Sequence, residues 1–265
     1  MPKAEIAVIG GSGFYQLFKN SHQTSVITPY GKPSDKLSLA VFADRKVVFL
    51  PRHGLRHQFP PHKINYLANL HAFKQLGVEW ILGPSACGSL KKNIKPGDFI
   101  ICDQFIDRTK DRVDTYYHGP KVVHLSASDP YCPTLRQLAY KTCRKLNITV
   151  HSKGTVVVVN GPRFSTKAES RYFADCGWDV INMTQYPEAI LARELKMCYV
   201  NLSLVTDYDA GIKDNPKIKP VYAAEVARIF KANNQKVLKL IKAMIKEIPK
   251  NRQCSCAQAL DQATL

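Results

Sequence analysis

Short runs of apolar residues alternate along this chain with longer segments in which apolar residues recur at helical spacing. The short runs predict buried strands, and the recurring spacing predicts amphipathic helices. Strands are expected at 5–9, 37–42, 46–51, 80–82, 98–102, 154–159, 179–183 and 197–206, and helices at 63–76, 133–146, 166–174, 187–195 and 219–248, the last with a candidate break at Asn233-Asn234. Strands that alternate with helices predict an α/β fold with a mixed central β-sheet surrounded by helices.

The 265 residues are enough for one large domain, and no segment has the composition of a linker. We therefore expect a single domain over 1–250 and a C-terminal tail over 251–265. The hydrophobic content of 45% and the charged content of 22% are typical of soluble globular proteins. Because the sequence shows no signal peptide and no apolar run with the length of a membrane span, we expect a cytoplasmic protein without a membrane partner.

The formal net charge is +17, and the basic residues concentrate at 91–95, 108–112 and 231–250. An excess of this size attracts anions such as nucleic acids, acidic membranes or phosphorylated substrates. The basic runs lack the interleaved aromatic residues of single-strand binders, so we expect no nucleic-acid partner. A solvated basic surface explains most of the charge, and the steering of phosphate toward a cleft is a second use for it.

Eight cysteines are spread along the chain, and several lie in apolar runs, where a free cysteine serves as a small core residue. No Cys-x-x-Cys pair is present, so the sequence predicts no zinc site. Cys254 and Cys256 lie close together in the tail. They either close a redox-active ring, form a clip to another cysteine, or lie in a frayed terminus.

Two acidic residues follow the last predicted strand, in the segment Val205-Thr206-Asp207-Tyr208-Asp209. Alternate residues of a strand point the same way, so Asp207 and Asp209 are expected to share a face. Such a pair suits a ligand with a basic ring nitrogen beside an amino group, as in adenine. The alternative is a solvated pair of acids in a turn, which is the commoner fate of this pattern.

Three small-residue turns at strand ends offer groups that bind an anion. Gly10-Gly11-Ser12-Gly13 does not fit the dinucleotide-binding fingerprint, but its amides and the Ser12 hydroxyl can hold an oxyanion. Arg52-His53-Gly54 supplies a guanidinium whose planar fork matches two phosphate oxygens. Ser85-Ala86-Cys87-Gly88-Ser89 is the third turn. Each turn taken alone also has a purely structural explanation.

Two further strand ends offer contacts for a heterocycle and a sugar. In Gly161-Pro162-Arg163-Phe164-Ser165-Thr166, Phe164 presents a ring face and Ser165 a polar contact. The alternative is that Ser165 or Thr166 only caps the helix that follows. Asn182-Met183-Thr184 offers an apolar floor and a hydroxyl.

In this order, these segments resemble the 5′-methylthioadenosine phosphorylases of the trimeric purine nucleoside phosphorylase family. The resemblance covers roughly residues 6–230 and is carried by Gly-Gly-Ser-Gly, Pro-Arg-His-Gly, Ser-Ala-Cys-Gly-Ser-Leu, Gly-Asp-Phe-Ile-Ile-Cys-Asp-Gln-Phe-Ile-Asp-Arg-Thr, Gly-Pro-Arg-Phe-Ser, Val-Ile-Asn-Met-Thr and Thr-Asp-Tyr-Asp. It implies a nucleoside phosphorylase-like fold, a homotrimer or dimer of trimers, and phosphorolysis of 5′-methylthioadenosine to adenine and 5-methylthioribose 1-phosphate. Inorganic phosphate would be a co-substrate, and no metal or organic cofactor is implied.

The resemblance also implies roles for individual residues, with Asp207 and Asp209 as the catalytic pair. It assigns phosphate binding to Ser12, Arg52, His53, Ser85, Ala86 and Thr184, base binding to Phe164, Ser165, Asp207 and Asp209, and contact with the ribose and its 5′ substituent to Met183, His124, Ala223 and Val226. The pocket for the 5′ substituent would be completed with help from a neighbouring subunit.

The chemistry of the residues agrees with these roles. Cleavage of an N-glycosidic bond builds positive charge on the sugar and negative charge on the purine. Phosphate stabilises the first charge, and a proton donated by Asp207 to purine N7 relieves the second. For this purpose Asp207 must hold a proton near neutral pH, which burial beside Asp209 would favour.

Three alternatives remain open. A 6-oxopurine or broad-specificity nucleoside phosphorylase would prefer an amide in place of one carboxylate, because two acceptors facing O6 repel it. A hydrolytic nucleosidase would not need Arg52, His53 and the hydroxyl turns. A basic nucleic-acid-binding protein would bind in a salt-sensitive way and leaves the acid pair unexplained. The acid pair therefore favours an adenine nucleoside.

Overall fold

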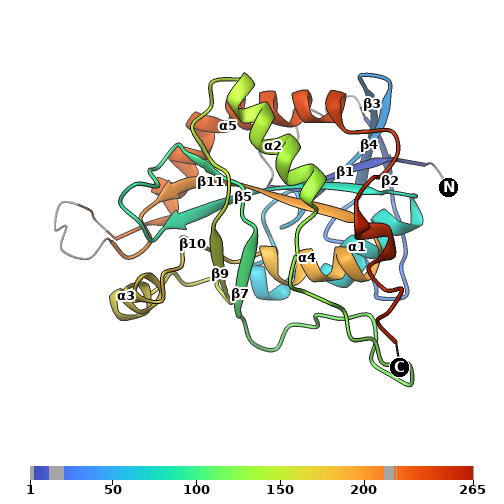
Figure 1. The fold of residues 1–265 in the computed structure, drawn as a ribbon, viewed down its shortest axis with the longest axis horizontal. Helices are drawn as coiled ribbons and strands as arrows, with labels where there is room; N and C mark the ends of the chain where they lie inside the picture. The colour runs from blue at the N-terminus through green and yellow to red at the C-terminus, as the bar shows by residue number, and fades with distance from the viewer. Residues whose placement is uncertain (1–2, 12–20, 212–217, 219, 265) are drawn as a thin grey trace.

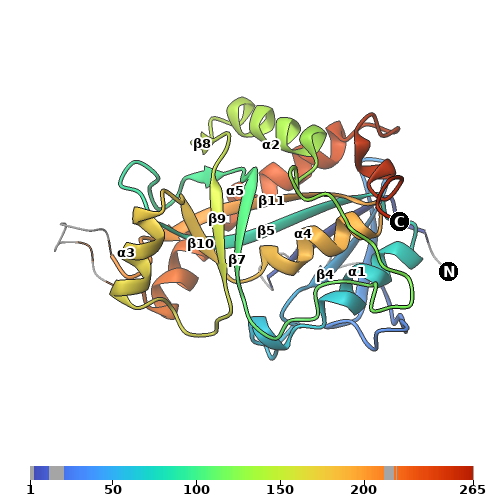
Figure 2. The same ribbon diagram turned by 60° about the horizontal axis from the view of Figure 1, so that its bottom comes forward.

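The computed structural model describes every residue of the chain except 1–2, 12–20, 212–217, 219 and 265. Helices lie on both faces of one large mixed sheet, as Figures 1 and 2 show. The strands are β1 (Ile6–Gly10), β2 (His22–Thr24), β3 (Leu37–Phe42), β4 (Arg45–Pro51), β5 (Trp80–Ser89), β6 (Phe99–Ile100), β7 (Gln104–Arg108), β8 (Val150–His151), β9 (Thr155–Val159), β10 (Val180–Asn182) and β11 (Cys198–Asp207). The helices are α1 (Tyr66–Gln75), α2 (Pro133–Lys145), α3 (Lys167–Asp175), α4 (Gln185–Glu194) and α5 (Ala223–Glu247), with short 3-10 turns η2 (Pro61–Lys63) and η3 (Ser255–Gln258).

Strand β1 shows why the apolar runs are continuous. Ile6 and Val8 belong to a core cluster with residues of α2 and α5, whereas Ala7 and Ile9 belong to a cluster with residues of α1 and α4. In Figure 1 the first pair of helices lies above the sheet and the second pair below it. Successive side chains of a strand point to opposite faces, so a strand covered on both sides needs an apolar residue at every position.

The sheet is mixed, as the sequence predicts. Its order is β2-β3-β4-β1-β5-β10-β9-β7, and β11 pairs with β5 as well. Strand β1 runs parallel to β4 and β5, whereas β3 is antiparallel to β4 and β10 is antiparallel to β5. The expected strands are all present, and β2, β7 and β8 are additional short strands that the apolar pattern did not predict.

The sheet divides at strand β5. On one edge, β11 pairs with β5 from Trp80 to Gly88. On the other edge, β1 pairs with residues 80–82 and β10 pairs only with Gly88 and Ser89. Within the described part of the chain, no strand pairs with that edge between 83 and 87. A sheet that opens in this way leaves backbone groups and small side chains facing the gap.

The turn expected at 85–89 is wrong, because these residues continue β5. The small residues serve close packing instead. A Cβ added to Gly83 would lie 2.6 Å from the Tyr199 hydroxyl, and one added to Gly88 would lie 2.7 Å from Asp207 Oδ1. Glycine in a strand interior commonly marks such a close approach.

Two helices differ from their expected limits for local reasons. Helix α1 begins at Tyr66 rather than at 63, because Asn65 caps it and its side chain accepts the Ala68 amide at 3.1 Å. Helix α5 runs without a break through Asn233-Asn234. The Asn233 side chain donates back to the Ile229 carbonyl at 3.0 Å, which satisfies it within the helix.

The C-terminal tail packs against the rest of the protein. Cys256 is buried in the same core cluster as α2 and α5, and Arg252 donates to the Lys196 carbonyl at 2.6 Å. Among the described residues, no helix combines the length and the apolar character needed to cross a membrane.

Candidate active site

A cavity of about 710 Å³ lies beside the open edge of β5. Its walls come from the end of β4, the middle of β5, the loop before α3, the ends of β10 and β11, and the first half of α5. The residues predicted from the sequence that line it are Arg52, His53, Ser85, Ala86, Phe164, Ser165, Met183, Thr184, Asp207, Asp209, Ala223 and Val226. The fold therefore brings together residues that are widely separated in the sequence.

Two predicted residues are not found in this cavity. Ser12 lies outside the described residues. His124 is exposed, and its backbone amide donates to the Ala263 carbonyl at 2.7 Å. It lines a separate surface cavity with Pro120, Lys121, Val122 and Thr264. His124 therefore does not face this cavity.

The guanidinium of Arg52 is paired with the carboxylate of Glu188, and both side chains are buried. Nε donates to one carboxylate oxygen, and Nη2 donates to the other at 3.0 Å. Nη2 also donates to the Ile9 carbonyl at 2.8 Å, and Nη1 donates to the Pro84 carbonyl at 3.3 Å. Glu188 thus occupies the fork that was expected to bind two phosphate oxygens. These partners leave a single N–H, on Nη1, for a ligand.

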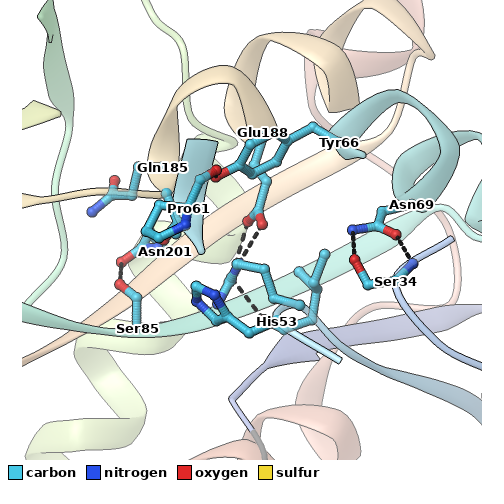
Figure 3. A network of polar contacts seen from close by, with 12 residues as sticks. Ser34, His53, Pro61, Tyr66, Asn69, Ser85, Gln185, Glu188 and Asn201 are labelled. Carbon is cyan, nitrogen blue, oxygen red and sulfur yellow. Dashed lines mark hydrogen bonds and ion pairs between the residues drawn. The ribbon is translucent and has the colours of Figure 1, made fainter. Parts of the chain in front are cut away.

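A buried polar network connects Arg52 to the open edge of β5, and Figure 3 shows Glu188 near one end of it and the Ser85–Asn201 pair at the other. The Tyr199 hydroxyl donates to Glu188 at 2.9 Å and accepts from Asn201 at 3.4 Å. Asn201 Oδ1 in turn accepts the Ser85 hydroxyl at 3.0 Å. Burial disfavours the charge of Arg52, but the charge of Glu188 outweighs it and raises the pKa of Arg52. The network therefore fixes both Arg52 and Ser85 before any ligand arrives.

His53 is neutral at physiological pH and has a defined tautomer. Burial, together with the charge of Arg52, lowers the pKa of His53 to about 4. Its Nδ1 lies 2.9 Å from the Phe59 carbonyl oxygen. Because a carbonyl only accepts, Nδ1 carries the proton and Nε2 is an acceptor. His53 can therefore accept a hydrogen bond from a protonated oxygen of a ligand, and it adds no positive charge.

Thr184 completes the anion-binding end of the cavity. It is the N-cap residue of α4, but the Thr184 side chain makes no capping hydrogen bond. The hydroxyl is therefore free to bind a ligand in the cavity that Thr184 lines.

Asp207 and Asp209 both line the cavity, although not through simple alternation along a strand. Strand β11 ends at Asp207, and its pairing with β5 shifts between Val205 and Asp207, which indicates a β-bulge. Asp209 then adopts a left-handed backbone with a φ of 49°. The Asp209 amide donates to Asp207 Oδ1 at 2.8 Å, and this contact holds the two residues together.

The acid pair has the proton affinity that an acid catalyst needs. Burial, aided by the charges of Asp209 and Glu225, raises the pKa of Asp207 to about 6. Burial also raises the pKa of Asp209. A carboxyl group in this range is partly protonated near neutral pH and can donate a proton to a ligand.

Ser165 faces Asp209 rather than capping α3. Thr166 is the N-cap, since its hydroxyl accepts the Glu169 amide at 3.1 Å and the Glu169 carboxylate accepts the Thr166 amide at 2.8 Å. Ser165 lies close enough to interact with the Asp209 carboxylate. Within the described residues, however, the buried Ser165 Oγ and Asp209 Oδ2 reach no partner at hydrogen-bonding distance. Buried polar atoms without a partner require an explanation, and a polar group of a ligand in the cavity would supply one.

Some lining residues were missed from the sequence. Asn182 and Thr206 border predicted residues, and Ala227 and Phe230 lie on α5 beside Val226. On a helix, residues three and four apart share a face, so the spacing after Val226 was a usable signal for Phe230. Asn182 belongs to the segment Asn182-Met183-Thr184 that the sequence pointed to, but no role was predicted for its own side chain.

Comparisons with known proteins agree with this geometry. The model of the phosphorylase superfamily matches residues 5–246. The chain is 51% identical over 267 residues to an S-methyl-5′-thioadenosine phosphorylase of Thermofilum pendens, and the match covers 100% of both chains. It is also 51% identical over 260 residues to the enzyme of that name from Pyrococcus furiosus, covering 98% of each. The structure of methylthioadenosine phosphorylase from Schistosoma mansoni in complex with adenine superposes with a TM-score of 0.92 and 34% identity, covering 99% of each chain.

Proposed function

The chain belongs to the phosphorylase superfamily and, within it, to the methylthioadenosine phosphorylases, and from this premise we propose that it cleaves 5′-methylthioadenosine with phosphate. The products are adenine and 5-methylthioribose 1-phosphate. The observation that carries the proposal is the placement of a protonatable acid pair and an anion-binding end in one cavity. In the reaction the N9–C1′ bond breaks, its electron pair passes to the purine, and a phosphate oxygen bonds to C1′.

At the base end, Asp207 donates a proton to purine N7 as the glycosidic bond breaks. This proton neutralises the charge that develops on the ring, which is where a catalytic group lowers the barrier most. Asp209, whose carboxylate lies beside Ser165, accepts from the 6-amino group. Ser165 contacts the base beside Asp209, and Phe164 offers a ring face to the heterocycle.

At the phosphate end, the anion lies between Thr184 and the remaining N–H of Arg52. The Thr184 hydroxyl supplies a neutral donor, and Arg52 supplies a charge that Glu188 partly balances. Nε2 of His53 accepts a hydrogen bond from the hydroxyl group of a hydrogen phosphate ion. The Ser85 hydroxyl donates to Asn201, so its oxygen and the adjacent backbone of Ala86 are what the ligand meets. We expect Ser12 to contribute at this end as well.

The middle of the cavity suits a sugar with an apolar substituent. Met183 presents a thioether to the ribose, and Ala223 and Val226 with Phe230 form an apolar wall on α5. This wall suits a methylthio group better than a hydroxyl, since burying an unpaired hydroxyl is costly.

The assembly, the location and the cofactor requirement remain predictions. We expect a cytoplasmic homotrimer, or a dimer of trimers, with phosphate as co-substrate and no metal or organic cofactor in the reaction. His124 supports an assembly of this kind, because it is exposed and lies outside the cavity of its own protomer. We propose that it contacts the 5′ substituent in the cavity of a neighbouring protomer.

The test is a cleavage assay with methylthioadenosine, adenosine, inosine and methylthioinosine, each with and without phosphate. We expect cleavage only with phosphate and fastest with methylthioadenosine. Equal cleavage in phosphate-free buffer would establish a hydrolase instead. A preference for the two 6-oxopurines would establish the alternative phosphorylase.

A further inference from the structure

Four cysteines from three separate segments meet on the side of the sheet covered by α2 and α5. Cys132 is the N-cap residue of α2, Cys198 is the first residue of β11, and Cys254 and Cys256 belong to the tail. Their Sγ atoms all lie within 4.8 Å of one another. Among the described residues, this is the group of side chains with the arrangement of a metal-ligand set.

The spacing of the sulfur atoms matches tetrahedral coordination. A Zn–S distance of about 2.3 Å places the sulfurs of a tetrahedral site roughly 3.8 Å apart. The Sγ atom of Cys254 lies 3.7 Å from that of Cys132 and 3.3 Å from that of Cys198. We propose that these four cysteines form a tetrathiolate Zn²⁺ site that anchors the C-terminal tail to the core.

The surroundings suit a structural site rather than a catalytic one. Four protein ligands leave no open position for water or substrate. Cys132, Cys198 and Cys256 are buried, whereas Cys254 is partly exposed and gives the ion a route of entry. Binding converts four thiols into thiolates, so each Zn²⁺ releases up to four protons to solvent.

The sequence predicted no zinc site because it contains no Cys-x-x-Cys pair. That rule depends on ligands being supplied in neighbouring pairs along the chain. Here one pair has the spacing Cys-x-Cys, and Cys132 and Cys198 become neighbours only when α2 and β11 pack together. Tertiary packing thus brings in two of the four proposed ligands, Cys132 and Cys198.

The site would also steady a surface loop. The tail continues from Cys256 to Ala263, whose carbonyl accepts the His124 amide at 2.7 Å. Lys196, close to Cys198 in the chain, pairs with Asp261 of the tail at 2.9 Å. A metal ion bound by the cysteines would therefore restrain the C-terminal tail, and the tail in turn holds the loop around His124 through the Ala263 carbonyl.

The test is the metal content of the intact chain, purified without chelator. We expect about one zinc per chain by elemental analysis. Substituted Co²⁺ should give the visible absorption of a tetrahedral cobalt thiolate. The double variant Cys254→Ser, Cys256→Ser should lose both signals, and Cys176→Ser, which changes an exposed cysteine elsewhere, should keep both. Circular dichroism shows whether each variant is folded, and the wild-type measurements decide the question even if the double variant unfolds.

Two outcomes overturn the proposal. One is a chain that carries no stoichiometric zinc and, after reduction, takes up no Co²⁺. The other is oxidation of the four cysteines to disulfides, seen as an intact mass that lacks the hydrogens lost in bond formation. In that case reductant, and not chelator, lowers the melting temperature. The zinc site predicts the opposite sensitivity.

Discussion

The guanidinium of Arg52, which lines the substrate cavity, forms a buried ion pair with the carboxylate of Glu188. The pair is an interior one, with exposed side-chain fractions of 2% for Arg52 and 0% for Glu188. Such a pair has little net attraction for distant anions, and its main effect is to fix the direction of the free N–H. We therefore regard Glu188 as a positioning residue for Arg52.

The first prediction concerns this pair. Arg52→Met should lower the free energy of unfolding by about 3–5 kcal/mol, because it leaves the Glu188 charge buried and unpaired. The double variant Arg52→Met, Glu188→Leu should regain much of this loss, since two apolar side chains can replace a buried pair. Urea denaturation measures both values. If the double variant is less stable than the single one by the full cost of a second substitution, the pair is not coupled in this way.

The same variants separate stability from catalysis. Both lack the guanidinium, so both should show a raised KM for phosphate and a smaller change in the KM for nucleoside. Glu188→Gln keeps Arg52 but loosens its position, so it should lower kcat at saturating phosphate. Initial-rate kinetics with each substrate varied in turn measures these effects. A larger change in the nucleoside KM than in the phosphate KM contradicts the assignment of Arg52 to the phosphate end.

The second prediction follows from the raised pKa of Asp207, about 6 in the folded protein against an ordinary value of 3.8. As pH rises, the unfolded chain releases this proton first, so ionisation favours the unfolded state. This loss of folding stability is absent below the pKa of Asp207 in the unfolded chain and complete above its pKa in the folded protein. It amounts to at most about 3 kcal/mol in the free energy of unfolding. The amide of Asp207→Asn cannot ionise, so this variant does not lose stability in this way. Its stability relative to the wild type should therefore rise between about pH 4 and pH 7.

Urea denaturation of the ligand-free protein across this range measures the difference. Asp129→Asn, at an exposed carboxylate, is the matched control and should track the wild type. A constant difference between Asp207→Asn and the wild type at every pH would show that Asp207 does not hold its proton in the fold.

The third prediction is a change in base preference. Asp207→Asn should lose most activity on methylthioadenosine, because an amide cannot donate the proton that N7 requires. It should gain relative activity on inosine, because the N–H of its amide can donate to the acceptors of an oxopurine. One buried hydrogen-bond mismatch of about 1–3 kcal/mol corresponds to a roughly five- to 150-fold change in preference. The ratio of kcat/KM for the two substrates measures it, and an unchanged ratio in the variant contradicts this account of specificity.

The fourth prediction uses the close approach of β5 to the acid pair. A Cβ on Gly88 would lie 2.7 Å from Asp207 Oδ1 and 3.2 Å from the Asp209 amide. Gly88→Ala should therefore displace the Asp207 carboxylate and lower kcat by at least tenfold, equivalent to about 1.4 kcal/mol in the barrier. Gly83→Ala is the comparison, since its Cβ meets Tyr199 on the other side of the network. It should affect the phosphate KM more than Gly88→Ala does. Equal effects of the two variants on both parameters would show only a general loss of packing.

Local pattern predicted most of the fold. The strands β1, β4 and β11 were found because both of their faces are buried, which requires uninterrupted apolar residues. Strand β5 was predicted too short, because its second half consists of small residues that are typical of turns. These residues are small because Tyr199 and Asp207 pack against them. A pattern of neighbouring residues cannot reveal contacts with side chains that lie far away in the sequence.

The site was predicted less completely than the fold, for a related reason. Family motifs indicated which side chains line the cavity, including Thr184 and Val226. They did not indicate that Glu188 occupies the fork of Arg52, since the two residues are 136 positions apart. The charge state of His53 also depends on burial and on the Phe59 carbonyl, which only the folded chain supplies.

The gap in the pairing of β5 also bears on how the chain folds. Gly88, at one end of the gap, pairs with Ile181, and Cys87 pairs on the opposite edge with Val205, so the strands beside this part of β5 belong to segments made much later in synthesis. Contacts between such distant segments carry a large loop-closure entropy and tend to form late. A partly folded chain therefore has no rudimentary version of the cavity, and a ligand that fits the cavity binds only the finished fold. Nucleoside and phosphate should therefore stabilise the folded state by mass action. Each tenfold increase in ligand concentration above the dissociation constant adds about 1.4 kcal/mol to the free energy of unfolding.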